Sequence, residues 1–203
     1  MATRKELAAR SRERILNAAL DLISEKGYDK VSVSAIMKEC GMSVGNFYHY
    51  FNAKEDLIAA LERDSYEHAN QELLLMRNLP IERQLRFYIM NWAQTETVRH
   101  HSPNYGRQWF IYYLSNSTPW KDPNNKINVA KNEIQSCFQH AIENGELRSN
   151  TPVEALAYQL SFEIIGMYLF FIMTDASFPM LDWANNFCEH SLKNIIAPYY
   201  AES

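Results

Sequence analysis

The side chains best suited to chemistry lie close together in residues 41–55. Phe47 and Phe51 are four residues apart, so a helix would place both on one face. The polar side chains next to them would then point away from this apolar face, and they belong to Asn46, Tyr48, His49 and Tyr50. An amide can pair with adenine through two hydrogen bonds, and hydroxyl and imidazole groups can bind phosphate oxygens. The segment therefore predicts a polar surface suited to a DNA duplex.

Capping residues divide this region into two short helices and the start of a longer one. Gly41 can adopt the left-handed conformation that ends a helix over residues 32–40, and Ser43 can cap the next helix. Asn52 followed by Glu55 is a capping-box pattern for the third helix. A helix of barely two turns is unstable alone, so its neighbours must hold the middle one. The first helix has an apolar inner side made of Val33, Ile36, Met37 and Cys40.

Two short helices across a glycine-containing turn match the helix-turn-helix, whose second helix enters the major groove of DNA. At these residues the sequence resembles the TetR/AcrR family of bacterial transcriptional repressors. Residues 33–36, 41–43 and 47–57 carry the resemblance, which covers roughly residues 1–60. It implies DNA contacts by Val33, Ser34, Val44, Gly45, Asn46, Tyr48, Tyr50 and Lys54. Val33 stands where the family more often has a polar residue.

Position within the helices suggests roles for several of these residues. Ser34 and Lys54 each lie in the first turn of a helix, where free backbone N–H groups bind phosphate. Val44 can pack on a thymine methyl group, and Gly45 removes a side chain where the backbone must come close. The alternative is that the aromatic residues of this segment only complete a three-helix core.

The net charge of the chain is negative, but the charges are unevenly distributed. A net charge of -4 at pH 7 argues against a nucleic-acid binder. Residues 1–60, however, carry nine Lys and Arg against eight Asp and Glu, whereas the remainder carries eleven against sixteen. Residues 1–9 are predicted to be a flexible arm. The basic residues near this end are in reach of the DNA backbone or a minor groove, and they are Arg4, Lys5 and Arg10.

Helical spacing of apolar residues continues through the rest of the chain. A connecting helix over about residues 53–79 ends at Pro80 and, at about 1.5 Å per residue, would be roughly 35–40 Å long. Further helices are predicted over residues 81–100, 105–114, 127–144, 151–174 and 181–196, with a loop at 115–125. The predicted fold is all-α. Residues 1–51 form a three-helix, helix-turn-helix head, and residues 52–203 form an antiparallel helical bundle that binds a ligand and dimerises.

Dimerisation is predicted because residues 158–173 are apolar nearly all round, and such a helix must bury more than one face. Two copies can satisfy this by forming a four-helix interface. A two-fold dimer also suits paired reading helices, which need half-sites about 34–36 Å or a multiple apart. The predicted interface consists of Leu156, Gln159, Leu160, Glu163, Met167, Trp183, Phe187 and His190. The alternative is the core of a single chain.

A ligand cavity is predicted from the many aromatic residues of the bundle, because pockets between helices are mainly apolar. The candidate lining residues are Tyr88, Trp92, Trp109, Tyr112, Tyr113, Phe138 and Phe162. Plain core packing is the alternative for each of them. The family resemblance implies an inducer site between helices four and eight, and the scarcity of cations there favours a neutral or mixed aromatic molecule. The resulting hypothesis is a repressor that a small molecule releases from a palindromic operator.

Enzyme and metal chemistry find little support in the sequence. No paired Glu-x-x-His motif for a di-iron site and no nucleophile elbow occurs, so no catalytic residue, metal site or cofactor is predicted. Glu96 with His100 and His101 could form a metal site, but a solvated helix end explains them better. An all-helical protein-interaction module without inducible DNA binding is the alternative function. It would explain the bundle but not residues 32–57.

The sequence also predicts a cellular location. Cys40, Cys137 and Cys188 are odd in number and share no CxxC spacing, so we expect buried thiols in a reducing compartment. The N-terminal segment is polar, unlike a signal peptide. The longest apolar run, residues 164–173, is shorter than the ~20 residues of a membrane span. A cytoplasmic protein that makes no membrane contact is expected.

Overall fold

The computed structural model describes residues 3–61, 75–98, 103–115 and 125–202, and within these ranges the chain is helical without any β-strand. The all-α prediction is therefore confirmed. An isolated β-bridge joins Leu147 to Tyr200. The named α-helices are α1 (Arg4–Lys26), α2 (Val33–Glu39), α3 (Val44–Phe47), α5 (Ile81–Val98), α6 (Pro103–Ser115), α7 (Lys126–Glu143), α8 (Val153–Met173), α9 (Met180–Phe187) and α10 (Lys193–Ile196).

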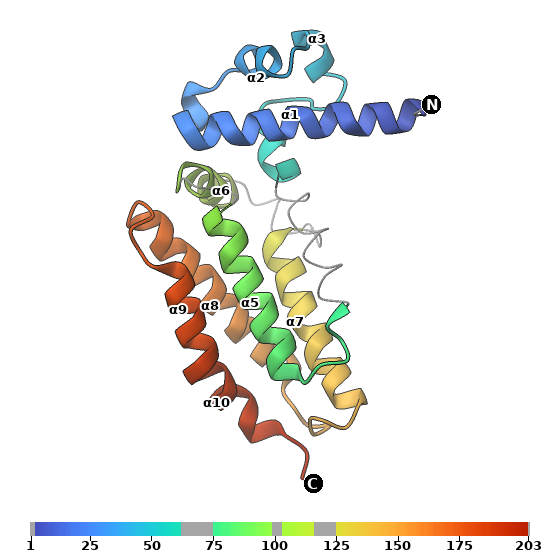
Figure 1. Cartoon of the computed structure of the whole chain (residues 1–203), viewed down its shortest axis with the longest axis vertical. Coiled ribbons are helices and arrows are strands. Elements are labelled where there is room, and N and C mark those ends of the chain that lie inside the picture. The colour runs from blue at the N-terminus through green and yellow to red at the C-terminus, as the bar shows by residue number, and fades with distance from the viewer. Residues whose placement is uncertain (1–2, 62–74, 99–102, 116–124, 203) are drawn as a thin grey trace.

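The helices form a head and a bundle. In Figure 1, α1 lies across one end of the molecule beneath α2 and α3, and α5, α7, α8 and α9 run away from it toward the C-terminus. The core of the bundle is built from α5, α7, α8 and α9, and Leu85, Phe138 and Leu160 are fully buried in it. The core of the head includes Ile15, Ile36 and further apolar side chains from α1 to α3.

Helix α6 is shared between the head and the bundle. Its aromatic residues Tyr105, Trp109 and Tyr113 belong to the same buried cluster as the apolar side chains of the head. In Figure 1, α6 lies between α1 and the bundle helices. The head therefore completes its core with a helix that lies in the predicted ligand-binding region.

The first helix begins earlier than the sequence analysis predicted. Residues 4–9 are not a flexible arm, because Thr3 and Glu6 form a capping box. The Glu6 N–H donates to Thr3 Oγ1 at 3.2 Å, and the Thr3 N–H donates to Glu6 Oε2 at 2.8 Å. This cap places Arg4, Lys5 and Arg10 on a helix with a defined direction.

The predicted connecting helix is described only at its two ends. Residues 56–61 and residue 75 are helical, residues 76–79 form a turn and a bend, and residues 62–74 lie outside the described residues. The cap also differs from the prediction. The carboxylate of Asp56 accepts hydrogen bonds from the N–H groups of Asn52 at 2.8 Å and Ala53 at 3.2 Å, so Asp56 takes the place expected for Glu55. The three-residue spacing of a capping box is kept, but it runs from Ala53 to Asp56 rather than from Asn52 to Glu55.

The bundle helices follow the predicted ranges with small shifts. Helix α6 starts at Pro103, two residues early, and α8 has Pro152 rather than Thr151 at its N-cap. The Thr151 hydroxyl instead donates to the Arg148 carbonyl at 2.6 Å. The predicted last helix is interrupted, because residues Cys188–Leu192 between α9 and α10 are π-helical. Most of the predicted 115–125 loop lies outside the described residues.

Helix α8 is more apolar than the longest uninterrupted apolar run suggested. It is 21 residues long with a mean hydropathy of 1.6 in its most apolar window, which by length and composition alone is enough to cross a membrane. The uninterrupted run is shorter because Glu154 and Glu163 interrupt it, but they do not lower the average hydropathy much. Half of that window is buried inside the fold, as expected of a core helix.

Candidate nucleic-acid interface

Helices α2 and α3 form the predicted helix-turn-helix. Ser32 caps α2 by accepting a hydrogen bond from the Ala35 N–H at 3.1 Å. Gly41 has a φ of +64°, the left-handed conformation that lets the chain turn into α3. The predicted cap of α3 is only partly right. Ser43 occupies the N-cap position, but its side chain makes no capping hydrogen bond.

A buried aromatic pair holds the second short helix. Helix α3 has four residues, and its last residue, Phe47, is fully buried. Phe51 lies beyond the helix, but its N–H donates to the Phe47 carbonyl at 3.0 Å and the two ring centroids are 5.2 Å apart. Tyr48 stacks edge-on against Phe47 at 5.3 Å while 59% of its surface remains exposed. The apolar side is thus closed and the polar side is open, as the spacing predicted.

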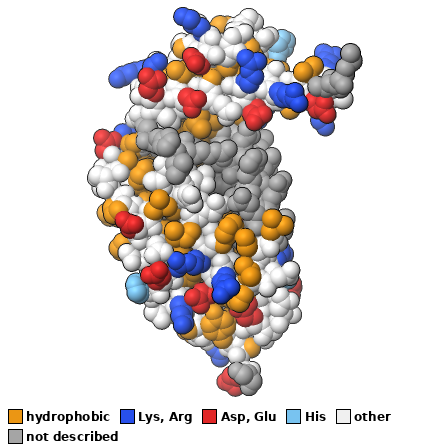
Figure 2. Space-filling view, in the orientation of Figure 1, with side chains coloured by type: hydrophobic (Ala, Val, Ile, Leu, Met, Phe, Trp, Pro, Cys, Tyr) orange, Lys and Arg blue, Asp and Glu red, His pale blue; other side chains and the backbone are white. Residues whose placement is uncertain are grey.

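The candidate DNA-contact residues all have access to solvent. Those with exposed side chains or backbone are Ser34, Val44, Gly45, Asn46, Tyr48 and His49, and those that are partly buried are Val33, Tyr50 and Lys54. Figure 1 places α2 and α3 at the end of the molecule opposite the C-terminus, and Figure 2 shows Lys, Arg, Asp and Glu side chains interleaved over this end. A duplex can therefore approach these residues without crossing the bundle.

A groove of about 470 Å³ separates the start of α1 from the α3 region. One side is lined by Arg4 and Ser11, and the other by Asn46, His49 and Tyr50. Arg4 was predicted to lie on a flexible arm, so its place on this side of the groove was not predicted. The Thr3-x-x-Glu6 pattern in the sequence was the signal that could have located it.

Lys54 contacts its own chain. Its Nζ donates to the Tyr28 carbonyl at 2.5 Å and lies 3.7 Å from the centre of the Tyr28 ring. Burial lowers the pKa of Lys54, whereas the nearby carboxylates of Asp29 and Glu55 oppose this change. The phosphate contact of Lys54 stays a prediction, and the structure adds a role in holding the head together.

Two further basic residues of α1 also support the head. The Arg14 guanidinium donates to the Cys40 carbonyl at 2.6 Å, just after α2 ends. The Arg12 guanidinium lies 5.6 Å from the centre of the Phe51 ring. Part of the basic charge near the N-terminus is therefore used inside the head, which the charge count alone did not reveal.

The predicted ligand residues are dispersed. Trp92 and Trp109 border a cavity of about 20 Å³ together with Ile127, Ala130, Ser161, Ile164, Ile165 and Tyr168. Tyr88 and Phe138 are packed in the bundle core, whereas Tyr113 is buried in the head cluster and Tyr112 packs against that cluster. Phe162 does not line the cavity, because its side chain is 64% exposed. The cavity has room for about one water molecule, far less than the ~300 Å³ of a small-molecule pocket.

A buried carboxylate lies next to this cavity. Glu96 of α5 is 2% exposed, and its side chain hydrogen-bonds to Tyr168. Burial raises the pKa of Tyr168 well above its ordinary value, and the charge of Glu96 raises it further. Glu96 was not among the residues predicted to line the pocket. Glu96 follows Trp92 by four residues, so the two share a helix face, and this spacing was the available signal.

The predicted dimer face is partly wrong. Leu156, Leu160 and Met167 are buried within their own chain, because they point toward the bundle core. The other predicted positions, Gln159, Glu163, Trp183, Phe187 and His190, are at least partly exposed. Large apolar side chains exposed on the outer side of α8 and on α9 are Tyr158, Phe162, Leu169, Phe170, Met173 and Trp183. We call these six residues the exposed aromatic face.

The cysteines have the predicted environment. All three are free and buried. Burial raises the pKa of Cys137 to about 12 and that of Cys188 to about 11, so both thiols stay protonated near neutral pH. Among the residues that the structure describes, no group of three or more His, Cys, Asp or Glu could hold a metal ion. His100 and His101 lie outside those residues.

Comparison with known proteins finds a family match in the head. Residues 15–61 match the family described as "Bacterial regulatory proteins, tetR family". The chain is 44% identical over 61 residues to the uncharacterized HTH-type transcriptional regulator YvdT of Bacillus subtilis, which is 30% of this chain and 31% of that protein. The match thus spans about a third of the length of this curated relative.

Solved structures extend the likeness to the whole fold. The fatty acid degradation regulator FadR from Bacillus halodurans superposes with a TM-score of 0.70 at 18% identity, over 89% of this chain and 97% of that one. SmeT, the repressor of the Stenotrophomonas maltophilia multidrug efflux pump SmeDEF, superposes with a TM-score of 0.69 at 17% identity, over 95% and 91%. SmeT has also been solved in complex with triclosan. The N-terminal part of this chain therefore matches the tetR family of bacterial regulatory proteins, and the chain as a whole has the same fold as FadR and SmeT.

Proposed function

We propose that this protein is a ligand-responsive, DNA-binding transcriptional regulator that represses from a palindromic operator until a small molecule releases it. The observation that carries the proposal is the helix-turn-helix, in which Phe47 closes the apolar side while Asn46, Tyr48 and His49 stay exposed. A polar surface on a rigid apolar support is what reading a duplex groove requires.

Helix α3 enters the major groove in this proposal. Asn46 pairs with an adenine through its amide, and Val44 packs against a thymine methyl group. Tyr48 and His49 bind phosphate oxygens and so set the register of the protein on the duplex. Arg4 faces Asn46 across the groove that borders α1, which puts a guanidinium beside the reading residues. Non-specific attraction to phosphates then comes from the basic end of the chain.

The protein acts as a homodimer in this proposal, with the exposed aromatic face as the interface. Soluble monomers rarely leave large contiguous apolar patches in water. Phe170, Phe178 and Trp183 form a ladder of rings, with centroids 5.9 and 6.2 Å apart, at one end of this face. Pairing two copies through α8 and α9 covers these rings and presents two heads to successive turns of one duplex. The protonated thiols suit a reducing, cytoplasmic location.

The ligand enters the bundle at the cavity between Trp92, Trp109 and Tyr168. That cavity is nearly closed, so a ligand must open it, and opening it moves α5, α6 or α8. SmeT, which has the same fold, forms a complex with triclosan, and this supports a small-molecule ligand for the present protein. Emptying an operator from 1:99 to 99:1 requires the ligand to favour the released form by roughly 5.5 kcal/mol.

The alternative is a helical protein-interaction module, which the exposed aromatic face favours. A partner protein could cover those side chains as well as a second copy of the chain does. This alternative does not require any duplex binding by the head, so DNA binding separates the two functions. A regulator selects duplexes of one sequence, whereas an interaction module selects none.

The test is selection of duplexes from a random-sequence pool by the full-length protein. We expect one palindromic sequence to be enriched, and Asn46→Ala to weaken binding by ~1–3 kcal/mol while relaxing the preference at one base position. Asn194→Ala is the matched control, because it removes an exposed amide at the far end of the chain. Absence of any enriched sequence, or normal selection by Asn46→Ala, would contradict the proposal.

A further inference from the structure

Helix α6 packs against both the head and the bundle. Its aromatic residues lie in the head core, and its glycine lies against α8. A Cβ atom at Gly106 would be 2.5 Å from Ile172 Cδ1 and 2.7 Å from the Tyr168 hydroxyl. Only a residue without a side chain allows this approach. A movement of α8 therefore has to move α6, and a movement of α6 has to move the head.

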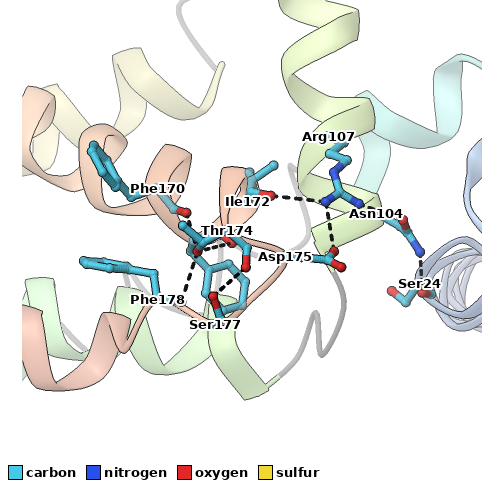
Figure 3. Close-up of polar contacts among 10 residues, drawn as sticks. Ser24, Asn104, Arg107, Phe170, Ile172, Thr174, Asp175, Ser177 and Phe178 are labelled. Carbon is cyan, nitrogen blue, oxygen red and sulfur yellow. Dashed lines mark hydrogen bonds and ion pairs between the residues drawn. The ribbon is translucent and has the colours of Figure 1, made fainter.

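A chain of polar contacts crosses the same boundary (Figure 3). The Asn104 amide at the start of α6 donates to the Ser24 carbonyl of α1 at 3.2 Å. The Arg107 guanidinium donates through Nη1 to Asn104 Oδ1 at 3.4 Å. Its Nη2 donates to the Ile172 carbonyl at 3.3 Å and to Asp175 Oδ1 at 2.9 Å. One arginine thus ties α6 to the end of α8 and, through Asn104, to the head.

The turn that holds Asp175 is itself well fixed. Asp175 and Ala176 have φ values of +54° and +64°, which non-glycine residues rarely adopt. Thr174 stabilises this backbone, because its hydroxyl donates to the Phe170 carbonyl at 2.7 Å and accepts from the Phe178 N–H at 3.0 Å. Phe170 and Phe178, whose tilted rings have centroids 5.9 Å apart, flank this turn beside the exposed aromatic face. The turn is therefore a fixed point beside the proposed interface.

We infer that Arg107 is a positioning residue, which sets the orientation of each head relative to the exposed aromatic face and so selects the spacing of the operator half-sites. The inference rests on the proposed function, because it takes that face to be the dimer interface. The planar guanidinium can hold several acceptors in one fixed geometry, which a lysine cannot. In this ion pair the side chain of Arg107 is 43% exposed and that of Asp175 is 78% exposed, so its main effect is on orientation rather than on global stability.

Two measurements on the full-length protein test this. The first compares binding of the selected palindrome with binding of the same duplex lengthened by two base pairs at its centre. In Arg107→Ala and Asp175→Asn, the ratio of the affinities for the two duplexes is expected to fall about fivefold. This is the upper range for such an ion pair. Asparagine tolerates the left-handed backbone at position 175, so the second variant keeps the turn. Arg107→Lys should recover only part of the loss.

The second measurement needs no DNA. Nitroxide labels at Glu39→Cys on the head and Glu154→Cys on α8 report the distance distribution within one chain diluted with unlabelled protein, and the native thiols are buried. We expect a narrow distribution in the parent protein and a broader one in Arg107→Ala. Arg86→Ala is the matched control. It removes an ion pair with Glu189 at 3.6 Å from a side chain that is 40% exposed, against 43% for Arg107.

The outcomes separate the two proposals. Unchanged spacing discrimination and an unchanged distance distribution in Arg107→Ala would overturn the inference, as would equal changes in Arg86→Ala. If the parent protein selects no duplex, the proposed function fails, and the distance measurement still decides whether Arg107 holds the head. Equal melting temperatures of the variants confirm that each difference arises in the folded state.

Discussion

Phe47 in the head and Phe170 in the bundle are both helical phenylalanines beside residues that we assign to binding, but their environments are opposite. Phe47 is fully buried beneath α3, whereas Phe170 is 57% exposed on α8. The surface near Phe47 is polar and complete without a protein partner. The surface near Phe170 is apolar and leaves ring faces in water. The head therefore suits a polar, charged partner, and we propose that the outer side of α8 pairs with another protein surface.

The two helices also differ in what stabilises them. Helix α3 has four residues and cannot form alone, so Phe47 and its contact with Phe51 must hold it. Helix α8 has 21 residues and is long enough to persist once its inner side is packed. A change in the support of α3 should therefore affect folding of the head, whereas a change on the outer side of α8 should affect only association.

The largest effect is expected for Phe47→Ala. Emptying this fully buried site should lower the free energy of unfolding by ~3–5 kcal/mol, measured by urea denaturation. Tyr48→Ala is the control from the exposed side of the same segment, and it should change stability far less. Equal losses in the two variants would mean that the head does not rest on the buried ring.

The next largest effect concerns the exposed aromatic face. Trp183→Glu should weaken dimerisation by at least ~2 kcal/mol, or about thirtyfold, because a charge would replace an aromatic anchor. Sedimentation equilibrium measures the change. Leu7→Glu places the same charge on an exposed apolar position of α1 and should leave association unaltered. A parent protein of monomeric mass, or a dimer indifferent to Trp183→Glu, would rule out this interface.

A smaller effect separates the two roles of Lys54. If its contact with Tyr28 supports the head, Lys54→Ala should lower stability by ~1 kcal/mol in thermal unfolding. Lys30→Ala removes an exposed lysine nearby and should not. A Lys54→Ala protein of unchanged stability that binds every duplex more weakly, with a flatter salt dependence, would show that the phosphate contact is the main role.

The smallest effect is expected in the turn between α8 and α9. Ala176→Gly should raise the free energy of unfolding by ~0.5–1 kcal/mol, because glycine adopts the positive φ at this position without steric cost. Ala155→Gly is the opposite control within α8 and should lower stability by ~1 kcal/mol. Differential scanning calorimetry on both proteins measures the two shifts. A destabilising Ala176→Gly would mean that other contacts of the turn outweigh the backbone conformation.

The sequence was most informative where the contacts are local. The Gly41 turn and the buried Phe47 and Phe51 were predicted, because left-handed glycines and a four-residue spacing act within one or two turns of the chain. The same reasoning could have placed the start of α1 at the Thr3-x-x-Glu6 capping box. The all-α class followed from helical spacing along nearly the whole chain.

Tertiary structure alone decided which side of each apolar helix faces inward. Helix α8 is apolar nearly all round, so its sequence cannot show that Leu160 points to the core and Phe162 to solvent. In the same way, only the fold brings Trp92 and Trp109 to one small cavity and makes α6 part of the head core. These outcomes depend on contacts between residues far apart in the chain, and helical periodicity carries no information about which distant helices will meet.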